Sequence, residues 1–407
     1  MGQNANLVSV PTLVESPFII ATIGGVTFGS YSAQGYGSGV MVQYPNYMES
    51  LEVTKVNGTV NTYTINFLYQ VPAGGDPNLL DKIFSRASKD RKISLSYGDW
   101  CSPGYIYKEE TCIITNVICS LSMDSSSIKY TIKCVSDAIG LMSTTHNFAA
   151  REAKPSDVLK EMLKSPKYGM REVFNGMNNN IDVLIASNDK PVKLKAQRQV
   201  TPLKYMEYLV QSMSSYSTPS NSPLQNSIYC LTIHDDIKNN YGGTYFKVTE
   251  VGVNTKNFDS IDTYELDVNY PGDHMITQFS LNNDQSWSIL YDFASEIQKD
   301  NYVYTISNGG ALVTEYVPNL VRSNSNEYST GLSSWWTRMT QFPIQATVTI
   351  KGLTRPSILM NYVRVNVWFA GGQKHISSGL YIITKQVDQI NSSGYKTTLS
   401  LLRVGGD

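Results

Sequence analysis

This chain of 407 residues contains little charge and no long apolar run. Charged residues make up 16% of the sequence and the net charge is −1. Proteins that bind nucleic acids or anionic membranes usually carry a basic surplus, which this sequence lacks. No stretch of 18 apolar residues is present, so we expect no membrane insertion. The first 20 residues lack the basic start and apolar core of a signal peptide, so we expect none.

Residues that carry chemistry are also scarce. The five cysteines are odd in number and form no CxxC motif, which predicts buried, reduced thiols rather than a disulfide framework. The four histidines are far apart, and none has a metal-binding spacing. The segment IHDD places His234 beside Asp235 and Asp236, but we interpret it as a strand end entering a turn rather than a metal or acid–base site. We therefore predict no enzyme, no catalytic or metal-binding residue and no cofactor.

The sequence is rich instead in tyrosine, with 27 residues, and in alternating strand patterns. The segment LEVTKVNGTVNTYTINFLYQV, residues 51–71, predicts a β-hairpin with Asn57 and Gly58 near its tip. A loop with an odd number of residues places Leu51 opposite Ile65 and Val53 opposite Tyr63, which gives a single apolar face. A two-residue turn would reverse the faces, so we predict the odd-length loop.

Four helices are predicted. Residues 75–90 have an apolar stripe at helical spacing, and a further helix is expected around 287–297. In KPSDVLKEMLKSP we expect Ser156 to be the N-cap, and in TPLKYMEYLVQSMS we expect Thr201 to cap a helix that begins at Pro202. The last two helices have apolar stripes that we expect to pack on neighbouring strands, with the residues Val158, Leu159, Met162, Leu163, Leu203, Met206, Leu209, Val210 and Met213.

Four strand patterns occur twice, in the same order. NTYTINFLY corresponds to IQATVTIKG, RKISLSYGDW to YVRVNVWFAGG, TCIITNV to YIITKQV, and SIKYTIKCV to YKTTLSLLRV. Unrelated antiparallel strands can share residue types by chance. We favour one β-barrel module used twice, because an internal repeat usually marks a pseudo-symmetric protein.

Four features together resemble the baseplate hub proteins of tailed bacteriophages: the segment YPNYMESLEVTKVNGTVNTYTINFLYQV, the strand end YGD, the helix KPSDVLKEML and the closing SGLYIITKQVDQINSSGYKTTLSLLRV. That group is similar to the hub part of VgrG-type spikes. The resemblance runs along the whole chain as a pattern of elements and includes no catalytic signature. It implies a homotrimer in which three chains with two barrels each form a pseudo-sixfold ring.

The resemblance also implies partners and a location. The ring would join the tail tube protein to the spike protein, contact other baseplate proteins and let genomic DNA pass. Its place would be the virion tail baseplate, after assembly in the host cytoplasm. The sequence stops at Asp407, directly after the last predicted barrel strand, so we expect the spike to be a separate protein.

The length favours more than one domain. We predict a mainly β protein with minor α content, which contains two related antiparallel tube-type barrels. The expected divisions are a first barrel at 15–145, a small α-containing linking domain at 146–215, strands of the second barrel at 216–275, an irregular or helical insertion at 276–340 and the remainder of the second barrel at 341–407.

Tryptophans give the candidate interface residues. Trp335, Trp336 and Trp368 are predicted to contact a neighbouring subunit, because Trp and Tyr are enriched at protein interfaces. Two alternatives stay open. Aromatic side chains also bind sugars, so the chain would then be a host-glycan-binding tail-tip module. The other alternative is a distal-tail or tube-initiator ring of true sixfold symmetry.

Overall fold

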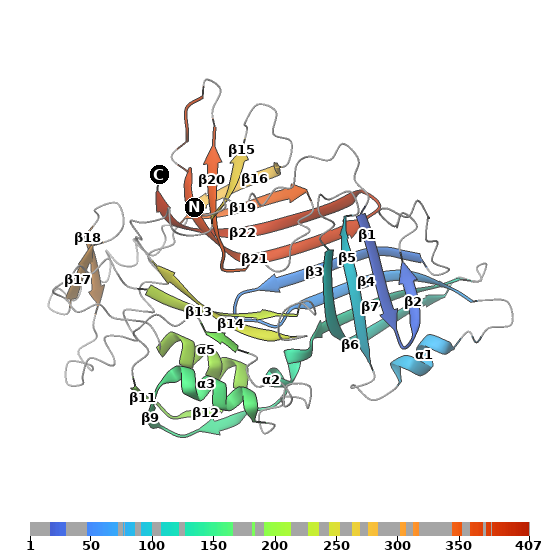
Figure 1. Ribbon diagram of the computed structural model, residues 1–407, viewed down its shortest axis with the longest axis horizontal. Helices are drawn as coiled ribbons and strands as arrows, with labels where there is room; N and C mark the ends of the chain where they lie inside the picture. Colours follow the sequence, from blue (N-terminus) through green and yellow to red (C-terminus); the bar gives the residue numbers. More distant parts are fainter. Residues whose placement is uncertain are drawn as a thin grey trace.

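The structure is a computed structural model (Figure 1). It describes residues 17–29, 47–71, 76, 78–85, 91–99, 107–121, 127–165, 181–183, 191–212, 227–235, 244–252, 263–268, 276–283, 302–306, 312–316, 344–351, 359–368, 372–375 and 377–406. The fold is mainly β, with a large, mostly antiparallel sheet and few helices, as predicted. The predicted helix at 287–297, together with Trp335 and Trp336, lies outside the described residues.

The first unit consists of seven strands and one short helix. Its strand pairings run β1–β5–β6–β7–β4–β3–β2 and return to β1, and the step from β2 to β3 is a single residue pair. The unit is thus a ring of strands that is only weakly joined at one place. Its elements are β1 (Pro17–Ile23), β2 (Val26–Gly29), β3 (Tyr47–Val56), β4 (Thr62–Gln70), α1 (Leu79–Phe84), β5 (Lys92–Asp99), β6 (Tyr107–Leu121) and β7 (Ser127–Ser136).

The register of the β3–β4 hairpin is the one predicted. Leu51 pairs with Ile65 and Val53 pairs with Tyr63 across a five-residue loop, residues 57–61. The buried residues of both strands share one face, as an alternating pattern requires. α1 also forms within the segment predicted to be helical, and it buries Leu80 and Ile83 against the same core.

The second unit is an open sheet in the order β15–β20–β21–β22–β19–β16. Within the described part of the chain, no pairing joins β15 to β16, so this sheet does not return to its start. β21 is long enough to change partners: residues 379–382 pair with β20, and residues 385–390 pair with β3 of the first unit. The strands are β15 (Thr263–Val268), β16 (Ile276–Asn283), β19 (Ile344–Lys351), β20 (Tyr362–Val367), β21 (Gly379–Asn391) and β22 (Gly394–Gly406).

The two units repeat the same pairing order. The first contains β3–β4–β7–β6–β5 and the second contains β16–β19–β22–β21–β20, and each strand matches its counterpart in chain order. The four repeated sequence patterns lie on the last four strands of each series. The two units differ in the strand that follows these five. In the first unit β1 pairs antiparallel with β5, whereas in the second β15 pairs parallel with β20.

The repeated Ile-Ile-Thr forms the same irregularity in both units. The register shifts between Ile114 and Asn116 in β6, and between Ile383 and Lys385 in β21, so the threonine between them is the extra residue of a β-bulge. The Thr115 hydroxyl donates to the Lys133 carbonyl at 3.0 Å. The Thr384 hydroxyl donates to the Ser400 carbonyl at 3.2 Å. The threonine therefore supplies a hydrogen bond at the place where the ladder is interrupted.

Replacing either bulge threonine with valine is expected to lower the free energy of unfolding by about 1 kcal/mol, because one hydroxyl-to-carbonyl bond is lost. Thr115→Val and Thr384→Val should have similar effects, which urea unfolding measures. Thr115→Ser and Thr384→Ser keep the hydroxyl and serve as matched controls. Valine variants as stable as the serine variants would contradict this account of the repeat.

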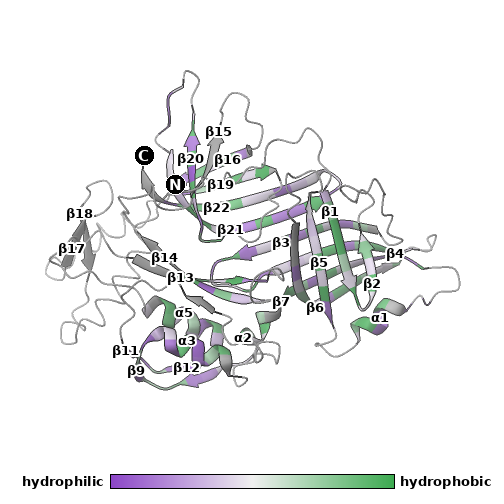
Figure 2. Cartoon of the chain, viewed as in Figure 1, coloured by the Kyte–Doolittle hydropathy of each residue, from purple (hydrophilic) through white to green (hydrophobic). Residues whose placement is uncertain are grey.

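The middle unit packs two helices on short strands. The described residues of the apolar stripes of α3 and α5 are buried as predicted, in one core with β13 and β14. Met213, also predicted in the stripe of α5, lies outside the described residues. Figure 2 shows hydrophobic residues along α5, whereas β9 and β12 are mostly hydrophilic. The elements are η2 (Asp137–Ile139), α2 (Gly140–Ser143), β8 (His146–Phe148), β9 (Arg151–Ala153), α3 (Pro155–Lys164), β10 (Ile181–Val183), β11 (Val192–Leu194), β12 (Gln197–Val200), α5 (Pro202–Ser212), β13 (Ser227–His234) and β14 (Tyr245–Gly252).

One predicted cap is correct and the other is wrong. The Thr201 hydroxyl accepts the backbone N–H of Lys204 at 3.4 Å, so Thr201 caps α5 as predicted. α3 begins two residues earlier than expected, at Pro155, and its N-cap is Lys154 without a side-chain cap bond. Proline suits the first helical turn because its missing N–H would be unpaired there. Ser156 therefore lies inside the helix.

Two segments differ from their predicted places. Strands within 216–275 were expected in the second barrel, but only β15 pairs there among the described strands. β13 and β14 form a separate sheet with β10, because their buried residues face α3 and α5. The start of the expected insertion at 276–340 is β16, a strand of the second unit. Farther along, β17 (Tyr302–Ile306) pairs with β18 (Leu312–Tyr316).

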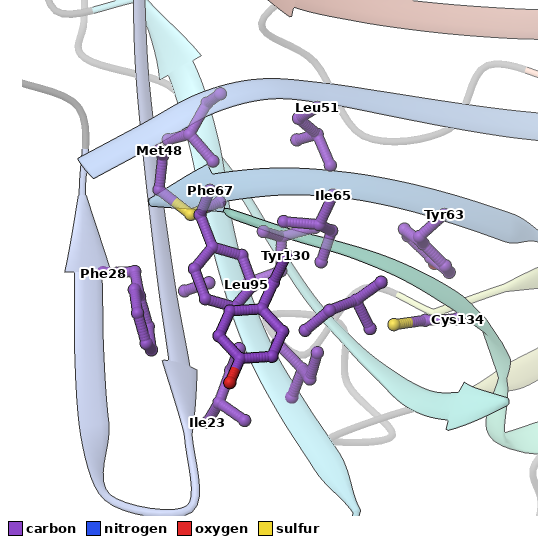
Figure 3. Close-up of a cluster of buried hydrophobic side chains, with 14 of the residues drawn as sticks. Ile23, Phe28, Met48, Leu51, Tyr63, Ile65, Phe67, Leu95, Tyr130 and Cys134 are labelled. Carbon is purple, nitrogen blue, oxygen red and sulfur yellow. The ribbon is translucent and has the colours of Figure 1, made fainter. Parts of the chain in front are cut away.

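Each unit has its own core. In the first, the ring of Phe67 lies 4.3 Å from that of Phe28 and stacks on Tyr130 at 5.4 Å between centroids (Figure 3). This core also includes Ile390 and Tyr395, which lie on β21 and β22 near their connecting turn. The β21–β22 hairpin thus belongs to both units. Its open end packs in the second core, and the residues next to its turn complete the first core.

Candidate functional site: a buried polar cluster where the three units meet

Buried polar and charged side chains gather where β3 and β4 of the first unit meet β13 and β21. Lys55, Glu110, Asp235 and Asp388 are all almost completely buried, which is rare for charged residues. We call the set the junction cluster, and it consists of Lys55, Asn61, Tyr63, Tyr97, Glu110, Ser136, Asp235, Thr244, Gln386, Asp388, Tyr395 and Thr397.

Strand alternation places the charges inside. Lys55 follows Leu51 and Val53 on the inward face of β3. On β21, the inward face carries Gln386 and Asp388 before the apolar Ile390. Because β21 pairs with β3 here, Gln386 lies opposite Lys55 and Asp388 lies opposite Val53. The register between two units therefore brings an amide and a carboxylate beside a lysine.

Lys55 and Glu110 form a buried ion pair, and both side chains are 1% exposed. Tyr97 donates a further hydrogen bond to Glu110 at 3.2 Å. Burial alone lowers the pKa of Lys55, but the charges of Glu110, Asp388 and Asp235 outweigh it and raise that pKa above its ordinary value. Lys55 is therefore a charged ammonium group that balances the buried carboxylates.

Asp235 connects the middle unit to the first. Its carboxyl contacts the amide Nδ2 of Asn61 at 2.7 Å and the hydroxyls of Ser136 and Thr244 at 2.6 Å each. Burial raises the pKa of Asp235, and the charge of Glu110 raises it further, while these three hydrogen bonds oppose the shift.

The phenol of Tyr63 bridges the two acids, at 2.9 Å from Glu110 and 3.0 Å from Asp235. A phenol has one proton, so it donates to one acid at a time. Each acid also has other donors, Lys55 and Tyr97 for Glu110 and Asn61 for Asp235.

Asp388 anchors the shared hairpin. Its carboxylate accepts hydrogen bonds from Gln386 Nε2 at 2.9 Å, the Tyr395 hydroxyl at 3.1 Å and the Thr397 hydroxyl at 2.7 Å. All three donors are on β21 or β22, so the end of this hairpin enters the first core with its polar groups paired. A buried carboxylate with several donors is stabilised in its charged form.

The hairpin loop at 57–61 holds the same junction through its backbone. The Asn57 N–H donates to the carbonyl of Thr384, the bulged residue of β21, at 3.0 Å, and the Gly58 N–H donates to the Leu231 carbonyl at 2.9 Å. Gly58 has φ +74°, and a Cβ atom there would lie 2.5 Å from the Glu207 carboxylate. The loop is therefore built for close approach to both other units.

The cluster has the chemistry of a structural contact between units. Its charged groups are enclosed, so they cannot meet a substrate from solution. In the described residues, no group of three or more His, Cys, Asp and Glu side chains is arranged to hold a metal ion. Asn61 Oδ1 is buried without a partner, whereas the carboxyls of Glu110, Asp235 and Asp388 each have several donors. Buried polar networks with good partners favour one arrangement of the elements that supply them. We interpret the junction cluster as the feature that sets how the three units are oriented.

Of the interface residues predicted from sequence, Trp368 is described, and it is not a member of the junction cluster. Trp368 is half-buried at the end of β20, where it bridges to Lys374, whose Nζ lies 5.2 Å from the ring centroid. Asp235 does follow a strand end, as predicted, but its burial was missed. A signal was present: Lys55 and Asp388 fall on the inward faces of their strands, where an apolar residue is expected.

His234 lies beside the cluster and is buried. It is hydrogen-bonded to Thr232 at 2.9 Å between Nε2 and Oγ1, and its ring stacks on Tyr245. Burial lowers the pKa of His234 to about 3, and the charges of Lys55 and Lys247 contribute. The folded protein therefore holds this histidine neutral at pH values where an unfolded chain would protonate it.

Acid is expected to destabilise the protein through His234. Its folded pKa is below the unfolded value of 6.5, so stability is complete above pH 6.5 and is lost as the pH falls toward about 3. The loss is roughly 1.4 kcal/mol per pH unit. Urea unfolding at pH 7, 6, 5 and 4 should show this slope as the difference between the wild type and His234→Gln. Equal pH dependence of the two proteins would contradict the assignment.

Solved phage tail proteins have a similar fold. The 43 kDa tail protein of prophage MuSo2 from Shewanella oneidensis aligns with TM-score 0.50 and 10% identity, over 96% of this chain and 100% of that one. The tail protein from Neisseria meningitidis MC58 aligns with TM-score 0.54 and 10% identity, over 95% of this chain and 97% of that one.

The same fold is found in a longer chain. A structure of the half-lidded Francisella PdpA-VgrG complex aligns with TM-score 0.50 and 10% identity, over 96% of this chain and 58% of that one. No protein-family profile and no curated protein matches this sequence. The chain therefore has the tail-protein fold of baseplate hubs and VgrG, as the sequence resemblance predicted. In the described residues, no helix has the length and apolar character needed to cross a membrane.

Proposed function

We propose that this protein is a phage baseplate hub: a homotrimer whose pseudo-sixfold ring joins the tail tube to the central spike. The observation that supports this most directly is the repeat within the chain. Both units have the same five-strand pairing order and the same threonine bulge. Three chains with two equivalent units each present six similar surfaces to a sixfold partner and three to a threefold partner.

The role is structural, and the partners follow from it. The tail tube protein contacts the sixfold side, the spike protein contacts the threefold side, and other baseplate proteins surround the ring. Genomic DNA passes through the ring, for which a net charge of −1 suits a lumen that does not retain DNA. Trp335, Trp336 and Trp368 are proposed subunit contacts. The ring belongs to the virion tail and is assembled in the bacterial cytoplasm.

Light scattering over a range of concentrations tests the proposal. Three chains of 45.3 kDa give about 136 kDa, which is the expected mass of the assembly. A strict hexamer would overturn the trimer and support a tube-initiator ring of true sixfold symmetry. A monomer that binds cell-wall glycans would overturn it in favour of a glycan-binding tail-tip module.

A further inference from the structure

β6 has an unusual second half. Up to Ile113 it lies between β5 and β7, but beyond that residue β7 is the one strand that pairs with it in the described part of the chain. Among the described strands, residues 116–121 therefore have one unpaired edge. Two apolar side chains on this segment are exposed, Ile118 at 48% and Leu121 at 75%. An exposed apolar edge strand is a template for pairing with another strand.

β16 has the complementary feature. It pairs with β19 along one edge, and no described strand pairs with its other edge. Leu281, near the end of β16, is 39% exposed. Among the described residues, four large apolar side chains are exposed, and three of them are on β6 and β16. Figure 1 places β16 in the upper part of the molecule and β6 at the lower right, so the two edges do not meet within one chain.

The chain already contains one copy of the contact that these edges can make. β21 is the counterpart of β6, and β3 is the counterpart of β16. After its bulge, β21 pairs antiparallel with β3 through residues 385–390. After the matching bulge, the equivalent residues of β6 are 116–121. Within the chain, this strand pairing joins β21 of the second unit to β3 of the first. The equivalent pairing, from β6 of the first unit to β16 of the second, is not made among the described strands of one chain.

We propose that residues 116–121 of β6 pair antiparallel with β16 of a second copy of this chain, in the register that β21 uses against β3. The bulged threonines and the carbonyls they contact align the two repeats. Glu52 then corresponds to Ser280 and Gln389 corresponds to Ser120. Glu52 lies opposite Gln389 within the chain, so Ser120 lies opposite Ser280 of the second copy.

The exposed side chains match in this register. Leu121 corresponds to Ile390, which is 3% exposed in the first core, whereas Leu121 is 75% exposed. Leu121 lies opposite Phe279 of the second copy and would enter the second core of that copy, as Ile390 enters the first. Cys119 lies opposite Leu281. The pairing thus buries Leu121 and Leu281 in a step that the chain has already made once, because their counterparts Ile390 and Val53 are buried. Ile118 faces the other side of the strand, where its counterpart Val387 is half-buried.

This contact joins different surfaces of the two copies, so each copy uses β6 toward one neighbour and β16 toward the other. Heterologous contacts of this kind generate a ring if the rotation closes. The inference rests on the proposed trimer for the number of copies, but the strand pairing is a separate claim. The test is designed so that the two can fail independently.

A cysteine pair tests the register directly. Leu281→Cys places a thiol opposite the native, exposed Cys119 of the neighbouring copy, at the Cα separation that disulfides require. Mild oxidation of the full chain should give covalent dimers and trimers on a non-reducing gel. Gln278→Cys is the control on the same strand: it is exposed, about 10 Å farther along and on the opposite face of the sheet, so the proposed register keeps it away from Cys119. Cys119→Ser with Leu281→Cys should abolish the cross-link.

Each outcome decides one claim. Cross-links in Leu281→Cys that end at three chains support both the pairing and the trimer. Cross-links that continue to six chains keep the pairing and overturn the trimer. A trimer by light scattering without the cross-link, or with stronger cross-linking in Gln278→Cys, overturns the register and leaves the hub. A monomer without cross-links overturns both.

A charge at the exposed leucine gives a second readout. Leu121→Asp should weaken association at least about tenfold, because the carboxylate would have to enter an apolar core. Met142→Asp is the matched control: Met142 is another exposed apolar residue, at 45%, on α2 rather than on either strand. Both variants should unfold at the same urea concentration as the wild type under conditions where the protein is monomeric. Equal association of the two variants would overturn the role of Leu121.

Discussion

Lys55→Met is expected to lower the free energy of unfolding by about 3–5 kcal/mol, as measured by urea or guanidinium unfolding. Methionine fills a similar volume, so the effect comes from charge. Without the ammonium group, Glu110 keeps its contacts with Tyr63 and Tyr97 but loses its buried ionic partner. Asp388 and Asp235 also lose the positive charge that offsets them. Buried carboxylates without a counter-charge are costly.

The chain contains a matched control. Lys82 forms an ion pair with Asp76, but its side chain is 65% exposed, so Lys82→Met should change stability by less than about 1 kcal/mol. The double variant Lys55→Met with Glu110→Gln removes both charges and should be more stable than Lys55→Met alone. Equal stability of Lys55→Met and Lys82→Met would contradict the role given to the junction cluster.

Phe67→Ala should have an effect of the same size, about 3–5 kcal/mol, for a different reason. Phe67 is fully buried in the first core between Phe28 and Tyr130, so alanine leaves a cavity and removes two ring contacts. Thermal or urea unfolding followed by tryptophan fluorescence measures the loss. The variant should also report on the whole chain, because this core includes Ile390 from the last hairpin.

Phe67→Leu is the control for volume. Leucine keeps most of the apolar side chain, so its cost should stay below about 1.5 kcal/mol. If the alanine and leucine variants are equally stable, the cavity does not determine the loss. A loss below 1 kcal/mol in the alanine variant would show that the core relaxes around the site.

The strands were predictable because their rules are local. A period of two fixed which residues of β3 and β4 face inward, and a single apolar face selected the five-residue loop. The repeat was visible because the Ile-Ile-Thr bulge recurs with its flanking strands. The caps show the limit of such rules. Thr201 caps its helix as the rule predicts. Ser156 does not, because Pro155 fits the first helical turn and the helix begins before Ser156.

The junction cluster could not be predicted in full, because its members are far apart in the chain. Asn61 meets Asp235 across 174 positions. No local pattern indicates that β21 changes partner after Thr384, or that β13 and β14 leave the second unit for α3 and α5. Lys55 and Asp388 did give a signal, since each occupies an inward position. A sequence pattern identifies such residues as unusual, but only the tertiary pairing identifies their partners.

The shared hairpin has a consequence for the order of events on the ribosome. β7 ends at Ser136, yet the first core also needs Ile390 and Tyr395, about 250 positions later. At bacterial rates of roughly 5–20 residues per second, the early strands wait for about 12–50 s before their last contacts exist. During that interval the edge of β3 is uncovered. A holding chaperone is therefore expected to engage the nascent chain, and release should follow synthesis of β22.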